Sequence, residues 1–238
     1  MSNFVVIVAG GKGKRMKADK NKCFLDLMGK EVLAWTTEVF EKLNFIDGIV
    51  FSMGSEEEER EVMSLAKKHG FKKILKAVTG VPTRQAGVYA GIKALEEFKV
   101  KDEDVVLVHN GANPFIQEGE IEQLIKALDD FDGSVCAFPV KDTTRQVDEN
   151  KVSLGVIDRS KLWLMQTPQC VRFGMAVKAF RKARADGFTG TDDVQLVERI
   201  GGKVKIVECS YENIKITTPE DLMLAEKILE KRLAFHDV

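Results

Sequence analysis

The stretch Phe4-Val5-Val6-Ile7-Val8-Ala9-Gly10-Gly11-Lys12-Gly13-Lys14-Arg15-Met16 decides the fold of this chain. Its first five residues are apolar and mostly β-branched, which predicts a buried strand. The strand runs directly into a turn of glycines and basic residues. Glycine lets backbone N–H groups come close to a phosphate, and lysine and arginine neutralise its charge. The stretch predicts a phosphate-binding turn after the first strand; the alternative is a tight connection without a ligand.

The rest of the chain alternates short apolar runs with amphipathic helical patterns. Further strands are expected at residues 48–52, 73–75, 104–108, 134–138, 203–207 and 213–216. Helices are expected at residues 31–43, 55–69, 84–98, 118–130, 173–185 and 192–200, and a last one opens at Thr218-Pro219-Glu220-Asp221. Short apolar strands between helices are typical of a parallel sheet that is covered on both faces. We therefore expect an α/β fold with a Rossmann-like, mostly parallel sheet flanked by helices.

One segment interrupts this alternation. Residues 139–170 show no long helical period and carry Pro, Asp, Arg and Trp in an extended-looking stretch. Long loops without structure of their own are uncommon and are usually functional. We interpret residues 139–170 as an extended β-arm for dimerisation and substrate contact, and residues 1–138 with 171–238 as the α/β domain. A long surface loop is the alternative.

The composition excludes several classes of partner. The 238 residues include 36 basic and 37 acidic side chains, for a formal net charge of −1. No global field therefore favours nucleic acid or an anionic membrane surface. The apolar start lacks the basic residues and the length of a signal peptide, and no run of about 20 apolar residues could span a bilayer. The 4 cysteines are widely spaced, which predicts a reduced, cytoplasmic protein without a Cys/His metal site.

The glycine turn departs from two familiar phosphate loops. A P-loop would need Gly at Val8 and Ser or Thr at Arg15, and a dinucleotide fingerprint would need Gly at Met16. Lys22 follows Arg15 after a short gap, and this order resembles the glycine loop, arginine and lysine of the nucleotidyltransferase superfamily. There the two cations hold the triphosphate of the nucleotide. Such a role suits phosphoryl transfer, in which positioned cations supply most of the catalysis.

Several later motifs narrow the resemblance. They are residues 108–115 (VHNGANPF), 139–145 (PVKDTTR), 159–169 (RSKLWLMQTPQ), 191–193 (TDD) and 213–222 (NIKITTPEDL). As a set, at these spacings, they make the chain similar to the 2-C-methyl-D-erythritol 4-phosphate cytidylyltransferase family, with ribitol-5-phosphate cytidylyltransferases as close cousins. The resemblance extends from about residue 4 to residue 230 and implies the nucleotidyltransferase fold.

The resemblance implies a cytidylyltransferase that moves CMP from CTP to a small phosphorylated polyol and releases pyrophosphate. The best guess for the polyol is 2-C-methyl-D-erythritol 4-phosphate, which would place the protein in isoprenoid biosynthesis. A phosphate oxygen of the acceptor would attack the α-phosphorus directly, without a covalent enzyme intermediate. The family further implies Mg²⁺ or another divalent cation, and a homodimer that interlocks through its arms. The alternatives are a related transferase acting on ribitol 5-phosphate or another sugar phosphate, and a non-catalytic nucleotide-binding homologue.

The resemblance also assigns the site residues. The catalytic cations would be Arg15, Lys22 and Lys215. The nucleotide would bind at Ala9, Gly10, Gly11, Gly13, Gly80, Arg84 and Gly87. The acceptor would lie against Asn113, Thr143, Arg145, Arg159, Thr167 and Thr191, and the metal against Asn110. Thr143 and Arg145 would reach the active site of a neighbouring subunit.

The chain departs from the family's pattern at three places. Asn110 replaces an Asp that helps to hold Mg²⁺, and a neutral amide contributes no negative charge. Asn113 replaces an Arg that binds the phosphate of the acceptor. Near the base, Val81, Pro82 and Gly87 stand where the family has Gly, an acid and Ser. The residues for the transfer are kept, and those for the base and the acceptor have changed.

Some of these residues also have ordinary structural explanations. Thr191 before Asp192-Asp193 is equally a helix N-cap. His109 is expected to be a buried structural ring at the end of its strand, and Trp163 a core or interface aromatic. The acidic run at residues 56–59 is expected to be a solvated first turn of a helix without a function.

Overall fold

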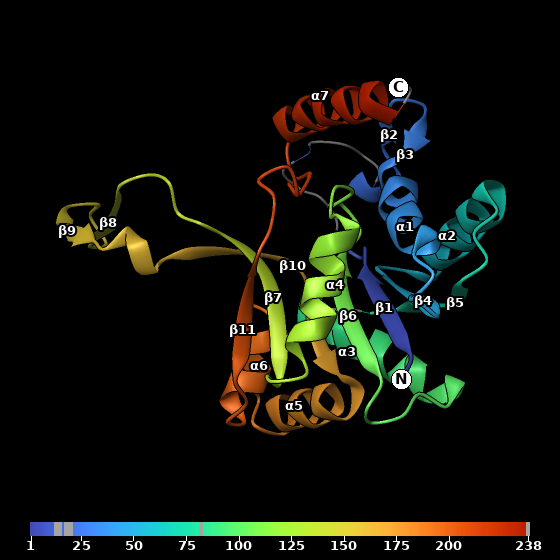
Figure 1. Ribbon diagram of the computed structural model, residues 1–238, viewed down its shortest axis with the longest axis horizontal. Coiled ribbons are helices and arrows are strands. Elements are labelled where there is room, and N and C mark those ends of the chain that lie inside the picture. The colour runs from blue at the N-terminus through green and yellow to red at the C-terminus, as the bar shows by residue number, and fades with distance from the viewer. Residues whose placement is uncertain (12–15, 17–20, 81–82, 237–238) are drawn as a thin grey trace.

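The structure, a computed structural model, describes residues 1–11, 16, 21–80 and 83–236 (Figure 1). Its centre is a seven-stranded sheet in the order β11-β7-β10-β6-β1-β4-β5. In that order the strands are β11 (Val204–Glu208), β7 (Gly133–Pro139), β10 (Trp163–Arg172), β6 (Val105–Asn110), β1 (Asn3–Val8), β4 (Gly48–Met53) and β5 (Ile74–Thr79). β10 is antiparallel to both of its neighbours, and the other pairs are parallel. The predicted α/β fold with a mostly parallel sheet is confirmed.

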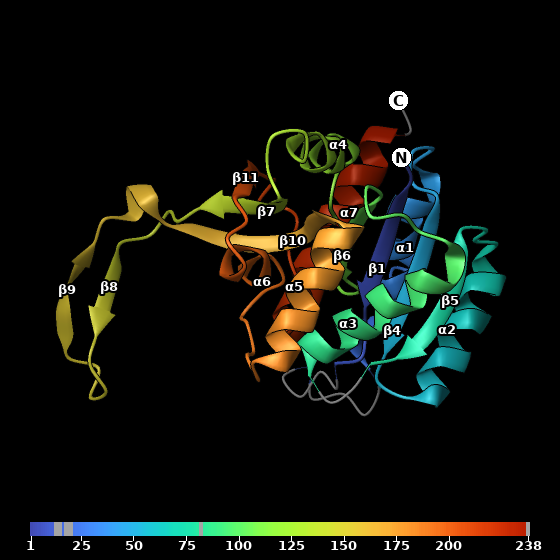
Figure 2. The ribbon, with the colours of Figure 1, turned by 90° about the horizontal axis from the view of Figure 1, so that it is seen from below.

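Helices cover both faces of the sheet (Figure 2). One layer holds α1 (Val32–Lys42), α2 (Glu56–His69), α4 (Glu118–Ala127) and α7 (Pro219–His236); the other holds α3 (Arg84–Leu95) with the 3₁₀ turn η3 (Glu96–Phe98), α5 (Phe173–Ala185) and α6 (Val194–Arg199). In β1, Val5 and Ile7 pack into the first layer, and Phe4 and Val6 into the second. Successive side chains of a strand point to opposite faces, and fully burying one such side chain contributes about 1.5–3 kcal/mol. None of the helices in the described ranges is apolar over a length that would cross a bilayer.

Six of the seven predicted strands are present, with bounds shifted by a few residues, and one prediction was wrong. Residues 213–216 form a loop, although their Asn-Ile-Lys-Ile pattern alternates like a strand. This segment is attached to the end of β6 by the Ile216 N–H, which donates to Ala112 O at 2.9 Å. A strand needs a series of hydrogen bonds to a neighbouring strand, and within the described residues this segment makes only one such backbone bond. The alternating pattern alone was not enough to predict a strand.

The sheet also contains a strand that the sequence did not predict. β10 inserts between β6 and β7, and its half-buried Trp163 pairs with Pro139. Pro168 and several polar side chains interrupt its apolar pattern, which hid the strand. Because β10 passes between two strands, Thr167 and Gln169 become buried in the sheet.

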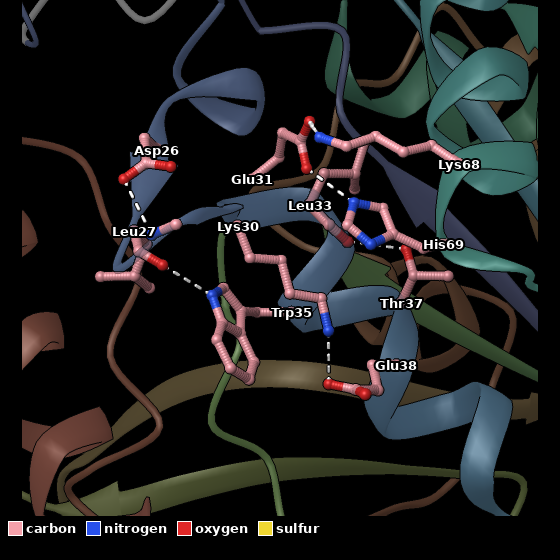
Figure 3. A network of polar contacts seen from close by, with 11 residues as sticks. Asp26, Leu27, Lys30, Glu31, Leu33, Trp35, Thr37, Glu38, Lys68 and His69 are labelled. Carbon is pink, nitrogen blue, oxygen red and sulfur yellow. Dashed lines mark hydrogen bonds and ion pairs between the residues drawn. The ribbon is translucent and has the colours of Figure 1, made fainter.

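A polar network fixes the short hairpin that precedes α1 (Figure 3). The hairpin pairs β2 (Asp26–Leu27) with β3 (Lys30–Glu31). Trp35 Nε1 donates to Leu27 O at 2.8 Å. The Glu31 carboxylate accepts from Lys68 Nζ at 2.6 Å and lies 2.7 Å from His69 Nε2. The end of α2 is thereby tied to the start of α1.

An arm leaves the α/β body between β7 and β10 (Figures 1 and 2). We define the arm as residues 140–162 and the body as the other described residues. The arm carries the ribbon of β8 (Thr144–Val147) and β9 (Ser153–Ile157), followed by the 3₁₀ turn η4 (Arg159–Lys161). Its exposed apolar side chains are Val147, Val152, Leu154, Val156 and Ile157. A two-stranded ribbon is at best marginally stable alone in water. We therefore expect another protein surface to pack on these side chains.

Candidate functional site

Gly10 and Gly11 begin the first turn, just after β1. A Cβ on Gly10 would lie 2.8 Å from Gly54 N, so only glycine fits between β1 and the end of β4. A Cβ on Gly11 would meet no other atom within 4 Å. Gly10 therefore seats the turn on the sheet, and Gly11 leaves its outer side open. The predicted site residues Gly13 and Arg15 lie outside the described residues.

Lys22 and the segment that carries Lys215 meet near this turn. Lys22 opens the 3₁₀ turn η2 (Lys22–Phe24), and its Nζ donates to Ile216 O at 2.6 Å. Burial raises the pKa of the Cys23 thiol to about 12, and the charges of Lys22 and Lys215 both act against that rise. Through its bond to Ile216 O, Lys22 lies against the backbone of the segment that carries Lys215, 193 residues later in the sequence (215 − 22).

A buried histidine ring lies one residue before the end of β6. His109 Nε2 lies 2.8 Å from Asn113 O, and the ring meets Phe40 edge-on with centroids 5.1 Å apart. Burial lowers the pKa of His109 to about 4, against the hydrogen bond to Asn113 and together with the charge of Lys215. The ring is therefore neutral near pH 7 and supports the loop that follows it. The structural role expected of His109 is confirmed.

Amide and hydroxyl groups join three segments at the same edge of the sheet. Thr167 Oγ1 accepts from Asn110 Nδ2 at 3.1 Å, and Thr167 O accepts from Asn213 Nδ2 at 2.9 Å. Asn113 Nδ2 donates to Asn213 O at 3.4 Å. Asn113 is 1% exposed, so its side chain is part of the wall and is not presented to a ligand. The network holds the loop that carries Lys215 against the ends of β6 and β10.

Gly80 and Gly87 bring two backbones into contact near the start of α3. A Cβ on Gly80 would lie 2.3 Å from Gly87 Cα and 2.3 Å from Ser52 Oγ. A Cβ on Gly87 would lie 3.0 Å from the same hydroxyl. The structure thus explains why these two positions are glycine: side chains would separate α3 from the ends of β4 and β5. Val81 and Pro82 lie outside the described residues.

Arg84 forms a bidentate ion pair across the site. Its two terminal nitrogens donate to the Asp193 carboxylate at 2.9 and 2.7 Å. Burial raises the pKa of Asp193, and the Arg84 charge opposes this rise. Gln169 Oε1 accepts from the Asp193 N–H at 2.8 Å. Arg84 therefore ties α3 to the start of α6, and a third of its side chain remains accessible (33%).

Thr191 is exposed at the entrance to α6. Its N–H donates to Gln195 Oε1 at 2.8 Å. The hydroxyl-cap explanation of Thr191 was wrong, because it is Asp192 Oδ1 that accepts from the Gln195 N–H, at 3.0 Å. Thr191 thus remains beside the Arg84–Asp193 pair with an exposed side chain.

The three predicted arm residues lie apart from this cluster within one chain. Thr143 is exposed just before β8, and Arg145 donates to Ser153 Oγ at 3.0 Å across the ribbon. Arg159 donates to Lys141 O at the base of the arm. The arm projects away from the body in both views (Figures 1 and 2). A single chain therefore does not bring these residues to Lys22 and Lys215.

Two residues beside the turn were missed by the sequence. Asn21 caps η2 and contacts both the first turn and α2, and Glu58, in the run that was expected to have no function, receives one of these contacts. One signal for Glu58 was available. Ser55-Glu56-Glu57-Glu58 has the spacing of a capping box, which predicts an inward carboxylate at its last position.

The described residues contain no cluster of three or more His, Cys, Asp or Glu side chains that could hold a metal ion. Asn110 nevertheless lies at the end of β6, half-buried, with its Nδ2 turned to Thr167. Its Oδ1 is a hard, neutral oxygen of the kind that Mg²⁺ accepts. Mg²⁺ commonly takes one or two protein oxygens together with substrate phosphates and water. This donor set fits a metal that arrives with a nucleotide and does not fit a resident metal.

The chain is similar to known proteins over nearly its whole length. The sequence model of the family described as "IspD: 2-C-methyl-D-erythritol 4-phosphate cytidylyltransferase" matches residues 3–231. The 2-C-methyl-D-erythritol 4-phosphate cytidylyltransferase of Bacillus licheniformis is 44% identical over 230 residues, which cover 97% of this chain and 96% of that protein. The protein of the same name from Clostridium acetobutylicum is 39% identical over 229 residues, or 96% and 98% of the two chains.

Solved structures give the same result. The 4-diphosphocytidyl-2C-methyl-D-erythritol synthase of Anaerococcus prevotii superposes with a TM-score of 0.82 at 29% identity, covering 96% of each chain. The 2-C-methyl-D-erythritol 4-phosphate cytidylyltransferase of Francisella tularensis superposes with a TM-score of 0.78 at 28% identity, covering 94% of this chain and 98% of the other.

Proposed function

The chain belongs to the 2-C-methyl-D-erythritol 4-phosphate cytidylyltransferase family, and from this we propose that it moves CMP from CTP to 2-C-methyl-D-erythritol 4-phosphate and releases pyrophosphate. The family makes it a nucleotidyltransferase. One geometric observation carries the proposal: Lys22 Nζ bonds to Ile216 O, which joins Lys22 and the Lys215 loop beside a glycine turn. Such a turn with two adjacent cations is a cradle for a nucleotide's phosphates.

The mechanism that we propose is direct in-line displacement. A phosphate oxygen of the acceptor attacks the α-phosphorus of CTP, a P–O bond forms, and the bond to the β-phosphate oxygen breaks. Lys22 and Lys215 neutralise charge on the α-phosphate and on the leaving pyrophosphate, with Arg15 as the proposed third cation. Gly10 and Gly11 keep the backbone close to the phosphates. No proton transfer is required, which agrees with a buried, neutral His109.

We propose that a divalent cation accompanies the nucleotide. Asn110 would supply one neutral oxygen, and the phosphates and water would supply the rest. The metal adds neutralising charge on the phosphates. Because Asn110 carries no negative charge, we expect a weaker hold on the metal than an Asp would give at this position.

The acceptor has to be recognised without help from the position 113 side chain. Asn113 is buried and bonded to Asn213, so it is withdrawn from the acceptor. We propose that Arg145 and Arg159, delivered by the arm of a second copy, meet the phosphate of the acceptor, with Thr143 beside them. This observation also favours a second candidate acceptor, ribitol 5-phosphate or a related sugar phosphate, because the original phosphate contact has changed.

We propose that the protein is a homodimer joined through its arms. The exposed apolar side chains Val152, Leu154 and Val156 lie on a ribbon that has no partner within the described chain. A second copy would cover them and would complete each active site with residues of the other chain.

The test is a pyrophosphate-release screen. The purified protein is incubated with Mg²⁺, each of the four ribonucleoside triphosphates, and either 2-C-methyl-D-erythritol 4-phosphate or ribitol 5-phosphate. We expect release only with CTP and the methylerythritol phosphate. Release with ribitol 5-phosphate alone would establish the second candidate. CTP binding without release, together with turnover in Asn110→Asp, would show a homologue whose metal site has decayed.

A further inference from the structure

The Glu58 carboxylate joins the start of α2 to the first turn. One oxygen, Oε2, accepts from the Gly54 N–H at 2.8 Å. The other, Oε1, accepts from Asn21 Nδ2 at 3.0 Å. Glu58 is only partly exposed, unlike Glu56 and Glu57 in the same turn of the helix. Its charge also acts on the Cys23 thiol, so it lies in the same electrostatic neighbourhood as Lys22.

Asn21 uses its whole amide group at this place. Nδ2 donates to Ala9 O at 2.7 Å as well as to Glu58, and Oδ1 accepts from the Cys23 N–H at 3.0 Å. The side chain thus spans the last residue before Gly10 and the turn that carries Lys22. Three contacts fix its orientation: Ala9 O and the Glu58 carboxylate both accept from Nδ2, and the Cys23 N–H donates to Oδ1.

We infer that Glu58 is a positioning residue for the nucleotide site: through Asn21 it holds the glycine turn and Lys22 at the separation that the phosphates of the nucleotide require. This inference rests on the proposed function for the identity of the ligand. Its geometry rests on the four hydrogen bonds of Glu58 and Asn21 alone. We call these two residues the Asn21–Glu58 clamp.

A helix cap accounts for only half of these contacts. Ser55 Oγ accepts from the Glu58 N–H at 3.2 Å, and Glu58 accepts from the Gly54 N–H, which together close the start of α2. The contact of Oε1 with Asn21 adds nothing to that cap. A carboxylate near bound phosphates would also repel them, so its presence there is costly unless it orders the cations. Charge-assisted hydrogen bonds are well suited to hold such an order.

The variant Glu58→Gln distinguishes the role of Glu58 as a helix cap from its role in positioning Asn21. The glutamine keeps one acceptor oxygen for the Gly54 N–H, and its amide nitrogen then faces Asn21 Nδ2, donor against donor. We expect the dissociation constant for CTP·Mg²⁺, measured by calorimetry, to rise about tenfold, with a larger change in KM than in kcat. Tm should change little because the cap remains. Glu57→Gln removes the same charge one residue earlier, on an exposed side chain, and should leave both quantities unchanged.

A reciprocal swap tests the direction of the hydrogen bond. Asn21→Asp places a carboxylate oxygen against both Ala9 O and Glu58, and should weaken CTP binding more than Glu58→Gln does. The double variant Asn21→Asp with Glu58→Gln restores a donor–acceptor pair and should recover part of that loss. A double variant no better than Asn21→Asp, or a Glu58→Gln protein with the parent's CTP affinity, would overturn the inference.

Hydrogen exchange makes the test independent of the proposed ligand. The Cys23 N–H is protected by Asn21, so exchange in a peptide covering residues 21–27 should be faster in Glu58→Gln and unchanged in Glu57→Gln. If the parent protein binds no CTP, the proposed function fails while this measurement still decides whether the clamp exists. Equal exchange in both variants would reject the clamp.

Discussion

The body and the arm differ in how far they bury the apolar side chains of their strands. In β1, Val5, Val6 and Ile7 are completely buried between two helical layers. In β9, Leu154 and Val156 are each 61% exposed on a ribbon that projects from the body. The body buries the apolar side chains of its central strands and holds Lys22 against the Lys215 loop, whereas the apolar side chains of β9 stay exposed within one chain. The difference supports the proposal that one chain builds the nucleotide half of the site and that a second copy supplies the acceptor half.

The largest effect is expected at the cation that the body supplies. Lys215→Ala should lower kcat/KM in pyrophosphate release by about 10²–10³-fold, the loss typical of one group that stabilises transition-state charge. Lys215→Arg should recover part of the activity. Lys205→Ala removes a lysine from the neighbouring strand β11 and serves as the control, with activity near that of the parent. Equal activity of Lys215→Ala and the control would place the chemistry elsewhere.

The next effect separates the two halves of the site. An equal mixture of Lys215→Ala and Arg145→Ala proteins, each nearly inactive alone, should regain about a quarter of the parent's activity. Half of the dimers are then mixed, and each mixed dimer keeps one intact site. The check is the pyrophosphate rate after mixing and dimer exchange. No recovery would mean that the arm serves its own chain, and the comparison between body and arm would fail.

Dimerisation itself should depend on the arm and not on exposed apolar residues of the body. Leu154→Asp should shift the mass in analytical ultracentrifugation from dimer to monomer, because it places a charge where apolar surface is buried. Met223, 67% exposed on α7, gives the matched control Met223→Asp, which should remain dimeric. A monomeric parent protein would contradict the proposed assembly directly.

A stability change should be confined to the body. Arg84→Ala leaves the buried Asp193 carboxylate without its partner and should lower the free energy of unfolding by about 3 kcal/mol, the low end for a buried pair because Arg84 is partly accessible. Arg145→Ala, which removes an arginine from the exposed ribbon, should change it by less than about 0.5 kcal/mol. Urea unfolding of both variants provides the measurement.

The smallest effect concerns acid stability. Burial acts to raise the pKa of Glu31, but hydrogen bonds from Lys68 and His69 lower it from 4.5 to about 2. A depressed folded-state pKa contributes stability that is present above 4.5 and is lost as the pH falls toward 2. Glu31→Gln should flatten the fall of Tm in that window, whereas Glu149→Gln, at an exposed side chain of the arm, should not. Parallel Tm profiles for Glu31→Gln and the parent would reject the assigned role of this network.

Some of the site could be predicted from sequence, because local chemistry was enough. The glycines of the first turn, Lys22 and the Lys215 segment stand in motifs whose order implies phosphate binding. The Asn21–Glu58 clamp was harder to predict from sequence. Glu58 lies in an acidic run that looks like an ordinary solvated turn, and its contact with Asn21, 37 residues away, is what distinguishes it. Asn113 was predicted to contact the acceptor. Its side chain is buried, which the sequence could not show, and it therefore does not face a ligand.

The sequence by itself determined the class of fold, the six apolar strands and the glycines that follow the first strand, because the hydrophobic period and the choice of glycine are local properties. It could not determine that residues 163–172 enter the sheet as an antiparallel strand or that residues 213–216 stay outside it, because pairing depends on which edges are free. Tertiary structure also decided the meeting of Lys22 with the Lys215 loop and the isolation of the arm. Both are contacts between distant segments, and their free energy comes from packing that no single stretch of chain contains.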